Sequence, residues 1–259
     1  MRRAFTDTAL CYRHPEWREQ SDEEALLRSM DAFGVGQGWV CGYEAAATHA
    51  FDEANRDVKR LAEAHPERFV PIGLVNPFHA FPAVDRLLDD GFKSIKILTG
   101  WGNWLTIGNV RRVVVPIART LAQRSLHLSI ALEGNVPVTG GSTFLPLIVR
   151  EACPDACIVL DHCWLPSSWE DYLALAQDDR DLWFTLHALP QALLRRVVRE
   201  LGLSRILLGS WLPETDPDLV YACLQRAAGI GDEMVGVLND NAARALAGLP
   251  PRRDPPGAP

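Results

Sequence analysis

Several features are scarce or absent in this sequence of 259 residues, and each absence argues against a class of protein. No stretch of about 18 uncharged apolar residues occurs, so we expect no membrane-spanning helix. The 26 basic residues are outnumbered by 33 acidic ones, so there is no basic footprint for nucleic acid. The N-terminal segment lacks the apolar run of a signal peptide, and we expect a cytoplasmic protein.

Common catalytic and metal-binding motifs are also missing. Neither H-x-H nor H-E-x-x-H occurs, and there is no G-x-S-x-G turn of the kind that carries a nucleophilic serine. Six cysteines are too few and too scattered for a disulfide framework. The spacing of Cys153, Cys157 and Cys163 is a weak zinc signal and is more typical of small buried residues around a strand. The chain holds only seven histidines but eight tryptophans.

The pattern that is present is a strict alternation of short apolar runs and helical periodicity. Eight runs are expected to be strands, each followed by helical sequence: 4–10, 39–44, 69–76, 94–98, 126–132, 156–162, 182–187 and 206–210. Ser21 and Glu24 read as a capping box that starts the first helix, which Gly34 ends. The first turn contains no glycine-rich phosphate loop, which argues against an open doubly wound sheet. We therefore predict one α/β domain, a (β/α)8 TIM barrel over residues 1–248, followed by a proline-rich flexible tail over 249–259.

In such a barrel, the side chains at the carboxyl ends of the strands form the active site. Alternation along the last barrel strands places His162 with Leu160 on the inward face, Asp161 outward, and His187 and Trp211 inward. Lys96 is the one polar residue in an apolar strand centre and is also expected to point inward. The mouth is predicted to contain Asp7, Cys11, Lys96, Glu133, His162, His187 and Trp211, with Trp101, Trp104 and Trp164 in the loops that follow.

Each candidate also has a purely structural interpretation. Lys96 and Glu133 could form an interior salt bridge without chemistry, and His187 could bond a backbone group. Cys11 is more often a small filler than a nucleophile. The tryptophans could be ordinary loop anchors, although several of them near one rim favour an aromatic-lined pocket.

Seven short stretches, spread in order over about residues 5–246, together resemble one known family. They are Met30–Val35, His65–Phe69, Val75–Pro77, Gly91–Lys96, Leu160–His162, Ser204–Ser210 and Asn241–Arg244. On these stretches the sequence resembles the amidohydrolase superfamily, in particular the amidohydrolase-2 group that includes aminocarboxymuconate-semialdehyde decarboxylase-like enzymes. The family fold is a (β/α)8 barrel, which agrees with the periodicity.

The resemblance implies a divalent metal at the barrel mouth, but this sequence departs from the family's ligand pattern. The two H-x-H positions after the first strand are Ala9 and Cys11. The fifth-strand histidine is replaced by Ala131, and the eighth-strand aspartate by Trp211. Only His162, at the end of the sixth strand, is retained. Because catalytic zinc usually takes three protein ligands, we predict no catalytic metal and no other cofactor.

The leading hypothesis is a metal-independent hydrolase or lyase (decarboxylase or cyclase type) acting on a small, carboxylated or aromatic metabolite. His162 or His187 would serve as general acid or base, with Glu133 as its orienting or second acid–base group. Lys96 would bind a carboxylate or stabilise negative charge, and Trp211 would form the pocket floor.

Two alternatives remain open. One is a non-catalytic barrel that binds a small ligand or a protein partner. The other keeps a metal on the unusual ligands Cys11, His162 and Glu133. Relatives of this group often form dimers, so the resemblance also implies a homodimer.

Overall fold

The computed structural model describes residues 4–13, 18–76, 80–99, 107–131, 144–161, 169–187 and 189–253. The strands are β1 (Phe5–Tyr12), β2 (Val35–Gly42), β3 (Phe69–Pro71), β4 (Gly73–Leu74), β5 (Ser94–Leu98), β6 (His127–Ala131), β7 (Cys157–Asp161), β8 (Leu182–Leu186) and β9 (Ile206–Leu208). Every described pairing between these strands is parallel. Since β3 and β4 are one strand interrupted at Ile72, these segments make eight barrel strands.

Two seams join the three-stranded and six-stranded sheets into a closed barrel. On one side, the Ile72 amide donates to the Val40 carbonyl at 2.9 Å. On the other, Trp211 N donates to Ala9 O at 2.8 Å and Cys11 N donates to Leu212 O at 3.0 Å. The predicted (β/α)8 barrel is therefore confirmed.

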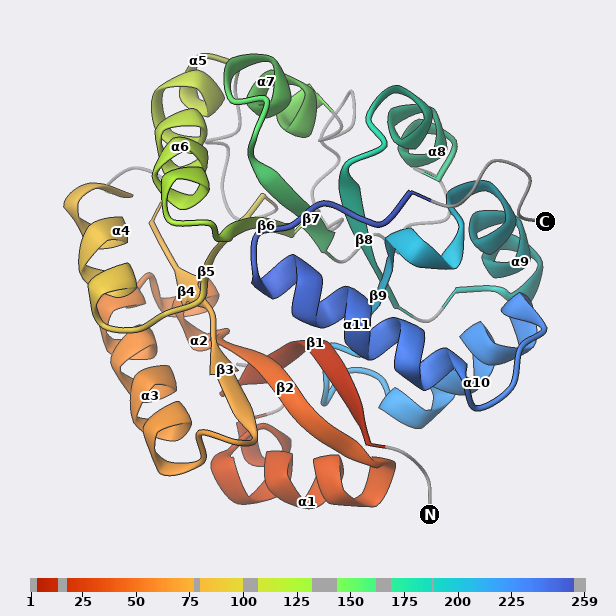
Figure 1. Cartoon of the computed structure of the whole chain (residues 1–259). Coiled ribbons are helices and arrows are strands. Elements are labelled where there is room, and N and C mark those ends of the chain that lie inside the picture. The colour runs from red at the N-terminus through yellow and green to blue at the C-terminus, as the bar shows by residue number, and fades with distance from the viewer. Residues whose placement is uncertain are drawn as a thin grey trace.

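The helices ring the strands, and one of them crosses the barrel (Figure 1). They are α1 (Glu23–Phe33), α2 (Glu44–Thr48), α3 (Phe51–Ala64), α4 (Ala80–Asp89), α5 (Ile107–Asn109), α6 (Val115–Gln123), α7 (Phe144–Ala152), α8 (Trp169–Asp178), α9 (Gln191–Leu201), α10 (Pro217–Ala228) and α11 (Met234–Leu246). A π-helical turn (Val110–Val114) joins α5 to α6, and short 3-10 helices cover Arg18–Gln20 and Leu203–Arg205. No helix among the described residues is long and apolar enough to cross a membrane.

The start of α1 corrects one local prediction. Asp22, not Ser21, is the N-cap, and its carboxylate accepts from Ala25 N at 2.8 Å. The capping box was placed one residue early because two adjacent residues both suit an N-cap. At the other end, Gly34 has a φ of 75° and ends the helix in the left-handed conformation, as predicted.

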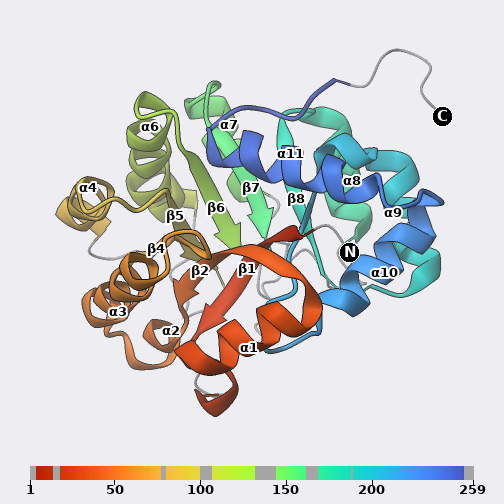
Figure 2. The same cartoon turned by 60° about the horizontal axis from the view of Figure 1, so that its bottom comes forward.

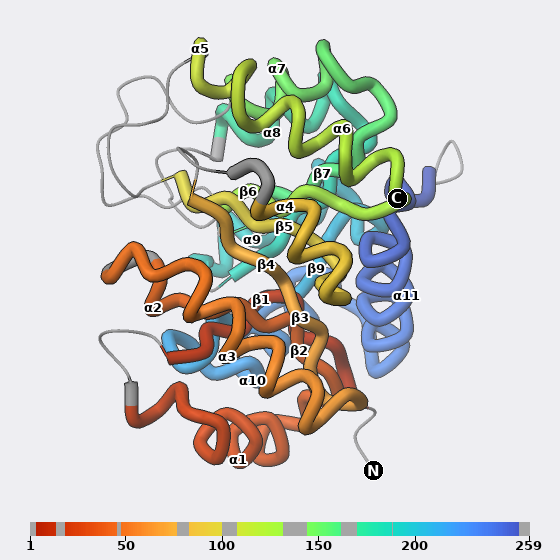
Figure 3. Tube along the Cα trace, turned by 90° about the vertical axis from the view of Figure 1, so that its left-hand side faces the viewer, coloured from red at the N-terminus to blue at the C-terminus, as the bar shows by residue number. Residues whose placement is uncertain are grey.

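Helix α11 closes the amino-terminal end of the barrel (Figures 2 and 3). Its residues Ala242 and Ala245 belong to the same buried cluster as the strand residues that face the barrel axis. Just beyond this helix, the Leu249 carbonyl accepts from Trp183 Nε1 at 2.9 Å and from Cys157 Sγ at 3.5 Å. The first residues of the proline-rich segment are thus fixed against the barrel.

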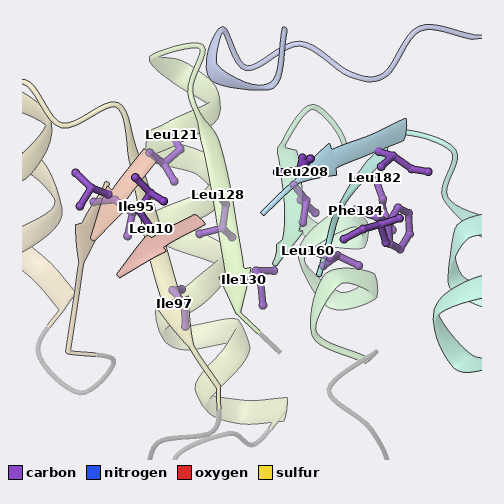
Figure 4. Close-up of a cluster of buried hydrophobic side chains, with 14 of the residues drawn as sticks. Leu10, Ile95, Ile97, Leu121, Leu128, Ile130, Leu160, Leu182, Phe184 and Leu208 are labelled. Carbon is purple, nitrogen blue, oxygen red and sulfur yellow. The ribbon is translucent and has the colours of Figure 1, made fainter. Parts of the chain in front are cut away.

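The buried side chains form two clusters, one on each face of the strands. The outer cluster fills the layer between strands and helices and includes Leu10, Ile130 and Leu160 (Figure 4). The interior cluster lies inside the barrel and includes Ala9, Cys11, Trp39, Cys41, Ala131, Val159, Trp183 and Trp211. Membership of these two clusters decides which side chains reach the candidate site.

Candidate active site

The positions that the family resemblance assigns to metal ligands do converge in the folded chain. Ala9, Cys11, Ala131 and Trp211 all belong to the interior cluster, and none is more than 2% exposed. Lys96 is 3% exposed and shares the inward face of β5 with Leu98, as predicted. The sequence thus identified the correct face of the strands at these positions.

The centre of the site is an ion pair between β5 and β7, which lie on either side of β6. Lys96 Nζ lies 2.5 Å from Asp161 Oδ2, and both side chains are almost fully buried. The indole of Trp211 completes the group, because its Nε1 donates to Asp161 Oδ1 at 3.2 Å. The same ammonium lies 5.1 Å from the centroid of the Trp211 ring, within the range of a cation–π contact.

These neighbours keep Lys96 charged inside the barrel. Burial alone acts to lower the pKa of a lysine, but the charge and hydrogen bond of Asp161, with the electrostatic influence of Cys41 and Cys11, outweigh it. The pKa of Lys96 is consequently held above its ordinary value. A permanent positive charge is therefore built into the carboxyl-terminal end of the barrel.

Asp161 corrects one expectation from the sequence. It was predicted to point outward with Leu160 inward, but Leu160 belongs to the outer cluster and Asp161 lies inside. Lys96 forms an interior salt bridge with Asp161, whereas Glu133, the partner considered from the sequence, lies outside the described residues. The error arose because both faces of a parallel strand are apolar, so alternation alone does not fix which face is inward.

Trp211 is held in its place by its backbone and by a second aromatic ring. Its φ of 56° lies in the left-handed region, which is unusual for a bulky residue. The hydrogen bond from its amide to Ala9 maintains this conformation, and Tyr43 packs edge-on against the ring at 5.1 Å. A conformation that costs free energy and is fixed by its surroundings is typical of functional positions.

A second polar group joins β1 to the end of β9. Asp7 Oδ1 accepts from the backbone amides of Ala9 and Ser210, and the Ser210 hydroxyl donates to Oδ2 at 2.5 Å. Burial raises the pKa of Asp7 to about 6, although these hydrogen bonds and His187 act to lower it. Asp7 was predicted to line the mouth. Its hydrogen bonds join β1 to the residue after β9, so the role that its contacts support is closure of the barrel.

His187 lies just beyond β8, at the carboxyl-terminal end of the barrel. Its Nε2 lies 3.2 Å from Thr215 Oγ1 and 4.0 Å from Glu214 Oε1. The ring is 4% exposed, and both partners lie in the loop after β9. An imidazole paired with a hydroxyl and a carboxylate at this end can accept and release a proton.

Another interior histidine was not singled out by the sequence. His127 begins β6 and stacks on Trp39 with ring centroids 4.9 Å apart. Burial, helped by the charge of Lys96, lowers the pKa of His127 to about 3, so the ring is neutral at physiological pH. Its position at the amino-terminal end of the barrel makes it a structural residue.

Five predicted site residues lie outside the described residues, so their roles remain predictions: Glu133, His162, Trp101, Trp104 and Trp164. Asp161, Thr215 and Glu214 were missed. Asp161 carried a usable signal, since it is the single charged residue in an apolar strand. Thr215 and Glu214 follow no periodic pattern, and only the folded loop brings them to His187.

A comparison with known protein families agrees with this barrel fold. The sequence profile described as Amidohydrolase (Amidohydro_2) matches residues 12–248, and the chain belongs to this family.

Solved structures share the fold at low sequence identity. An uncharacterised TIM-barrel protein from Bordetella bronchiseptica is 19% identical, with a TM-score of 0.73 over 95% of this chain and 99% of its own. 2,6-Dihydroxybenzoate decarboxylase from Rhizobium is 14% identical, with a TM-score of 0.73 over 94% and 98%. A dihydroxybenzoic acid decarboxylase from Polaromonas, solved with manganese and the inhibitor 2-nitroresorcinol, is 12% identical, with a TM-score of 0.73 over 94% and 97%. No curated protein matches.

The described residues at the family's ligand positions do not fit such a metal. Ala9 and Ala131 carry no ligating atom, and the only polar atom of the Trp211 side chain is an N–H donor. Among these positions only Cys11 has a ligating side chain, and it lies within electrostatic range of the Lys96 ammonium. No group of three or more histidine, cysteine, aspartate or glutamate side chains suited to a metal occurs in the described ranges.

Proposed function

We propose that this chain is a metal-independent enzyme in which the Lys96 ammonium supplies the fixed positive charge of the active site. The observation that carries the proposal is the position of the Lys96 ammonium inside the barrel. It faces the Trp211 ring and lies within electrostatic range of Cys11, two positions where the resemblance puts metal ligands, and Asp161 holds it. A fixed cation in a water-poor site stabilises negative charge that develops in a transition state.

The chemistry of an ammonium differs from that of a divalent metal. A metal can both stabilise an anion and generate a hydroxide nucleophile from bound water. A lysine held by a carboxylate can do only the first, so we propose a reaction of the lyase type. When a small aromatic or unsaturated acid loses its carboxyl group as carbon dioxide, the electron pair of the broken bond stays on the substrate. Lys96 would stabilise this negative charge, and an adjacent acid would protonate the carbon.

We assign the proton transfer to His187, with Thr215 and Glu214 orienting its ring. Asp161 is a positioning residue that holds both the ammonium and the Trp211 indole. Trp211 offers an aromatic floor for a planar substrate. Glu133 and His162 remain candidates for a second acid–base group.

The decisive experiment combines metal analysis with a search for substrates. The protein is dialysed against a chelator, its metals are quantified, and release of carbon dioxide from a panel of aromatic and unsaturated carboxylic acids is followed. We expect activity without stoichiometric metal. Activity that appears only when manganese or zinc is added back would overturn the proposal, and hydrolysis in place of decarboxylation would overturn the lyase assignment.

Two variants and one matched control test the residues. Lys96→Met and His187→Ala should each lower kcat by about 10²-fold or more, the usual scale for a charge-stabilising or acid–base group. Lys59→Met makes the same substitution in a surface salt bridge with Asp90 and should leave activity unchanged. Equal activity of Lys96→Met and the control would refute the role of Lys96.

One observation favours a second candidate, a non-catalytic binding protein. Lys96, Asp161 and Trp211 are each at most 3% exposed, as expected for a structural group. Under this alternative, aromatic acids would bind in calorimetry with no turnover of any panel compound.

A further inference from the structure

Two cysteines stand side by side at the carboxyl-terminal ends of β1 and β2. Cys11 and Cys41 are direct partners in the register of these strands. Both belong to the interior cluster, are at most 2% exposed, and are not joined in a disulfide. Neighbouring strands lie about 5 Å apart, within the range of Cα separations that a disulfide bridges. These two side chains therefore form a dithiol inside the barrel.

The other described cysteines do not share this arrangement. Cys153 lies in the outer cluster, whereas Cys157 is inside the barrel at its opposite end, beside Leu249. Cys223 lies on α10, outside the barrel. Within the described parts of the chain, only Cys11 and Cys41 are paired across adjacent strands on one face.

The Lys96 ammonium makes this pair chemically distinct from ordinary buried thiols. Lys96 lies within electrostatic range of both cysteines. A positive charge in that range favours the thiolate, which is the form that reacts with oxidants. The Cys41 thiol donates to the Leu10 carbonyl at 3.8 Å. Cys11 is assigned as the attacking sulfur and Cys41, whose proton is engaged in this contact, as the second one.

We propose that Cys11 and Cys41 are a modification site, at which an oxidant of the peroxide class forms a disulfide. The Cys11 thiolate attacks one peroxide oxygen, the O–O bond breaks, and the departing hydroxide takes up a proton to leave as water. Cys41 sulfur then displaces the hydroxyl group of the resulting sulfenic acid, and a second water leaves with the Cys41 proton. Two thiols and one hydrogen peroxide give one disulfide and two waters. This chemistry needs no substrate and goes beyond the proposed function.

The test uses the folded, full-length protein and hydrogen peroxide. After oxidation the protein is quenched in acid, alkylated and digested with trypsin for mass spectrometry. We expect the peptide of residues 4–13 to be linked to that of residues 29–56, with the loss of two hydrogens, and the link to be reversed by dithiothreitol. Two free, alkylated cysteines at peroxide concentrations that oxidise Cys223 would overturn the proposal. A link from either cysteine to a different partner would also overturn it.

Alanine variants separate the two steps while preserving an apolar core position. Cys41→Ala should abolish the link and leave Cys11 as a sulfenic acid that dimedone traps. Cys223→Ala should form the link as the natural sequence does. If Cys11 in the Cys41→Ala variant remains a thiol under the same conditions, it is not the attacking residue and the proposed mechanism is wrong.

Discussion

The buried pair of Lys96 and Asp161 permits a quantitative prediction about stability. Lys96→Met removes the cation and leaves the Asp161 carboxylate, which is 1% exposed and still accepts a hydrogen bond from Trp211 Nε1. Removing one partner of a buried pair costs about 3–5 kcal/mol, because the other charge is left uncompensated. We expect this loss in the free energy of unfolding, measured by urea denaturation at neutral pH.

The partner variant and the double variant complete a thermodynamic cycle. Asp161→Asn should cost somewhat less, because the Trp211 ring still faces the ammonium. The double variant leaves no buried charge, so its cost should be smaller than the sum of the two single costs by about 3 kcal/mol. Lys59 and Asp90 provide a matched surface pair at 2.7 Å, whose coupling should stay below about 1 kcal/mol.

The cycle is decisive because it has a clear negative outcome, in which the costs of the two substitutions simply add. Costs that add to within about 0.5 kcal/mol would show that the two charges do not interact in the folded state. In that case the 2.5 Å contact would not be a stable feature of the barrel, and the reasoning that makes Lys96 a fixed charge would fail.

Two further predictions concern other interior residues. Two opposing effects act on the free energy of unfolding between about pH 4 and pH 6. The pKa of His127 is depressed, so its ring binds a proton mainly in the unfolded chain and stability rises with pH. The pKa of Asp7 is raised, so its carboxylate binds a proton mainly in the folded chain and stability falls with pH; each effect amounts to about 1.4 kcal/mol per pH unit. Asp7→Asn should therefore lose stability more steeply on acidification than the natural sequence, and His127→Gln less steeply; parallel urea-denaturation curves would contradict this. Gly209→Ala should cost about 1–3 kcal/mol, because the new Cβ would lie 2.2 Å from Thr185 Cγ2. Thr185→Ser removes that methyl group and should restore part of the melting temperature in the double variant, and no rescue would place the strain elsewhere.

The sequence predicted the barrel well because its signals are local and repeated. Ser94–Leu98 was predicted with its observed bounds, and Lys96 marked its inward face as the only charged residue in that strand. The start of β2 was missed because Val35 is followed by glycines, one of which lets Leu10 pack against the strand. Signals between residues close together in the sequence therefore explain most of the fold.

The site was predicted less completely because its contacts are long-range. Trp211 could be placed at the mouth by position, but its bond to Asp161 spans 50 residues and left no periodic trace. The pairing of His187 with Thr215 depends on the path of a loop. A homodimer and a cytoplasmic location remain predictions.

The contact between the first strand and the last helix of the chain has a consequence for synthesis on the ribosome. Asn239 in α11 accepts from Thr6 N at 2.8 Å and donates to the Ala4 carbonyl at 3.0 Å, and thereby binds the start of the first strand. β1 also needs the segment after β9 to satisfy its second edge. The nascent first strand must therefore wait, with one edge unpaired, until nearly the whole chain has emerged. Closure of the barrel is consequently a late step of folding, and until it occurs the unpaired edge exposes the chain to aggregation or makes it depend on a chaperone.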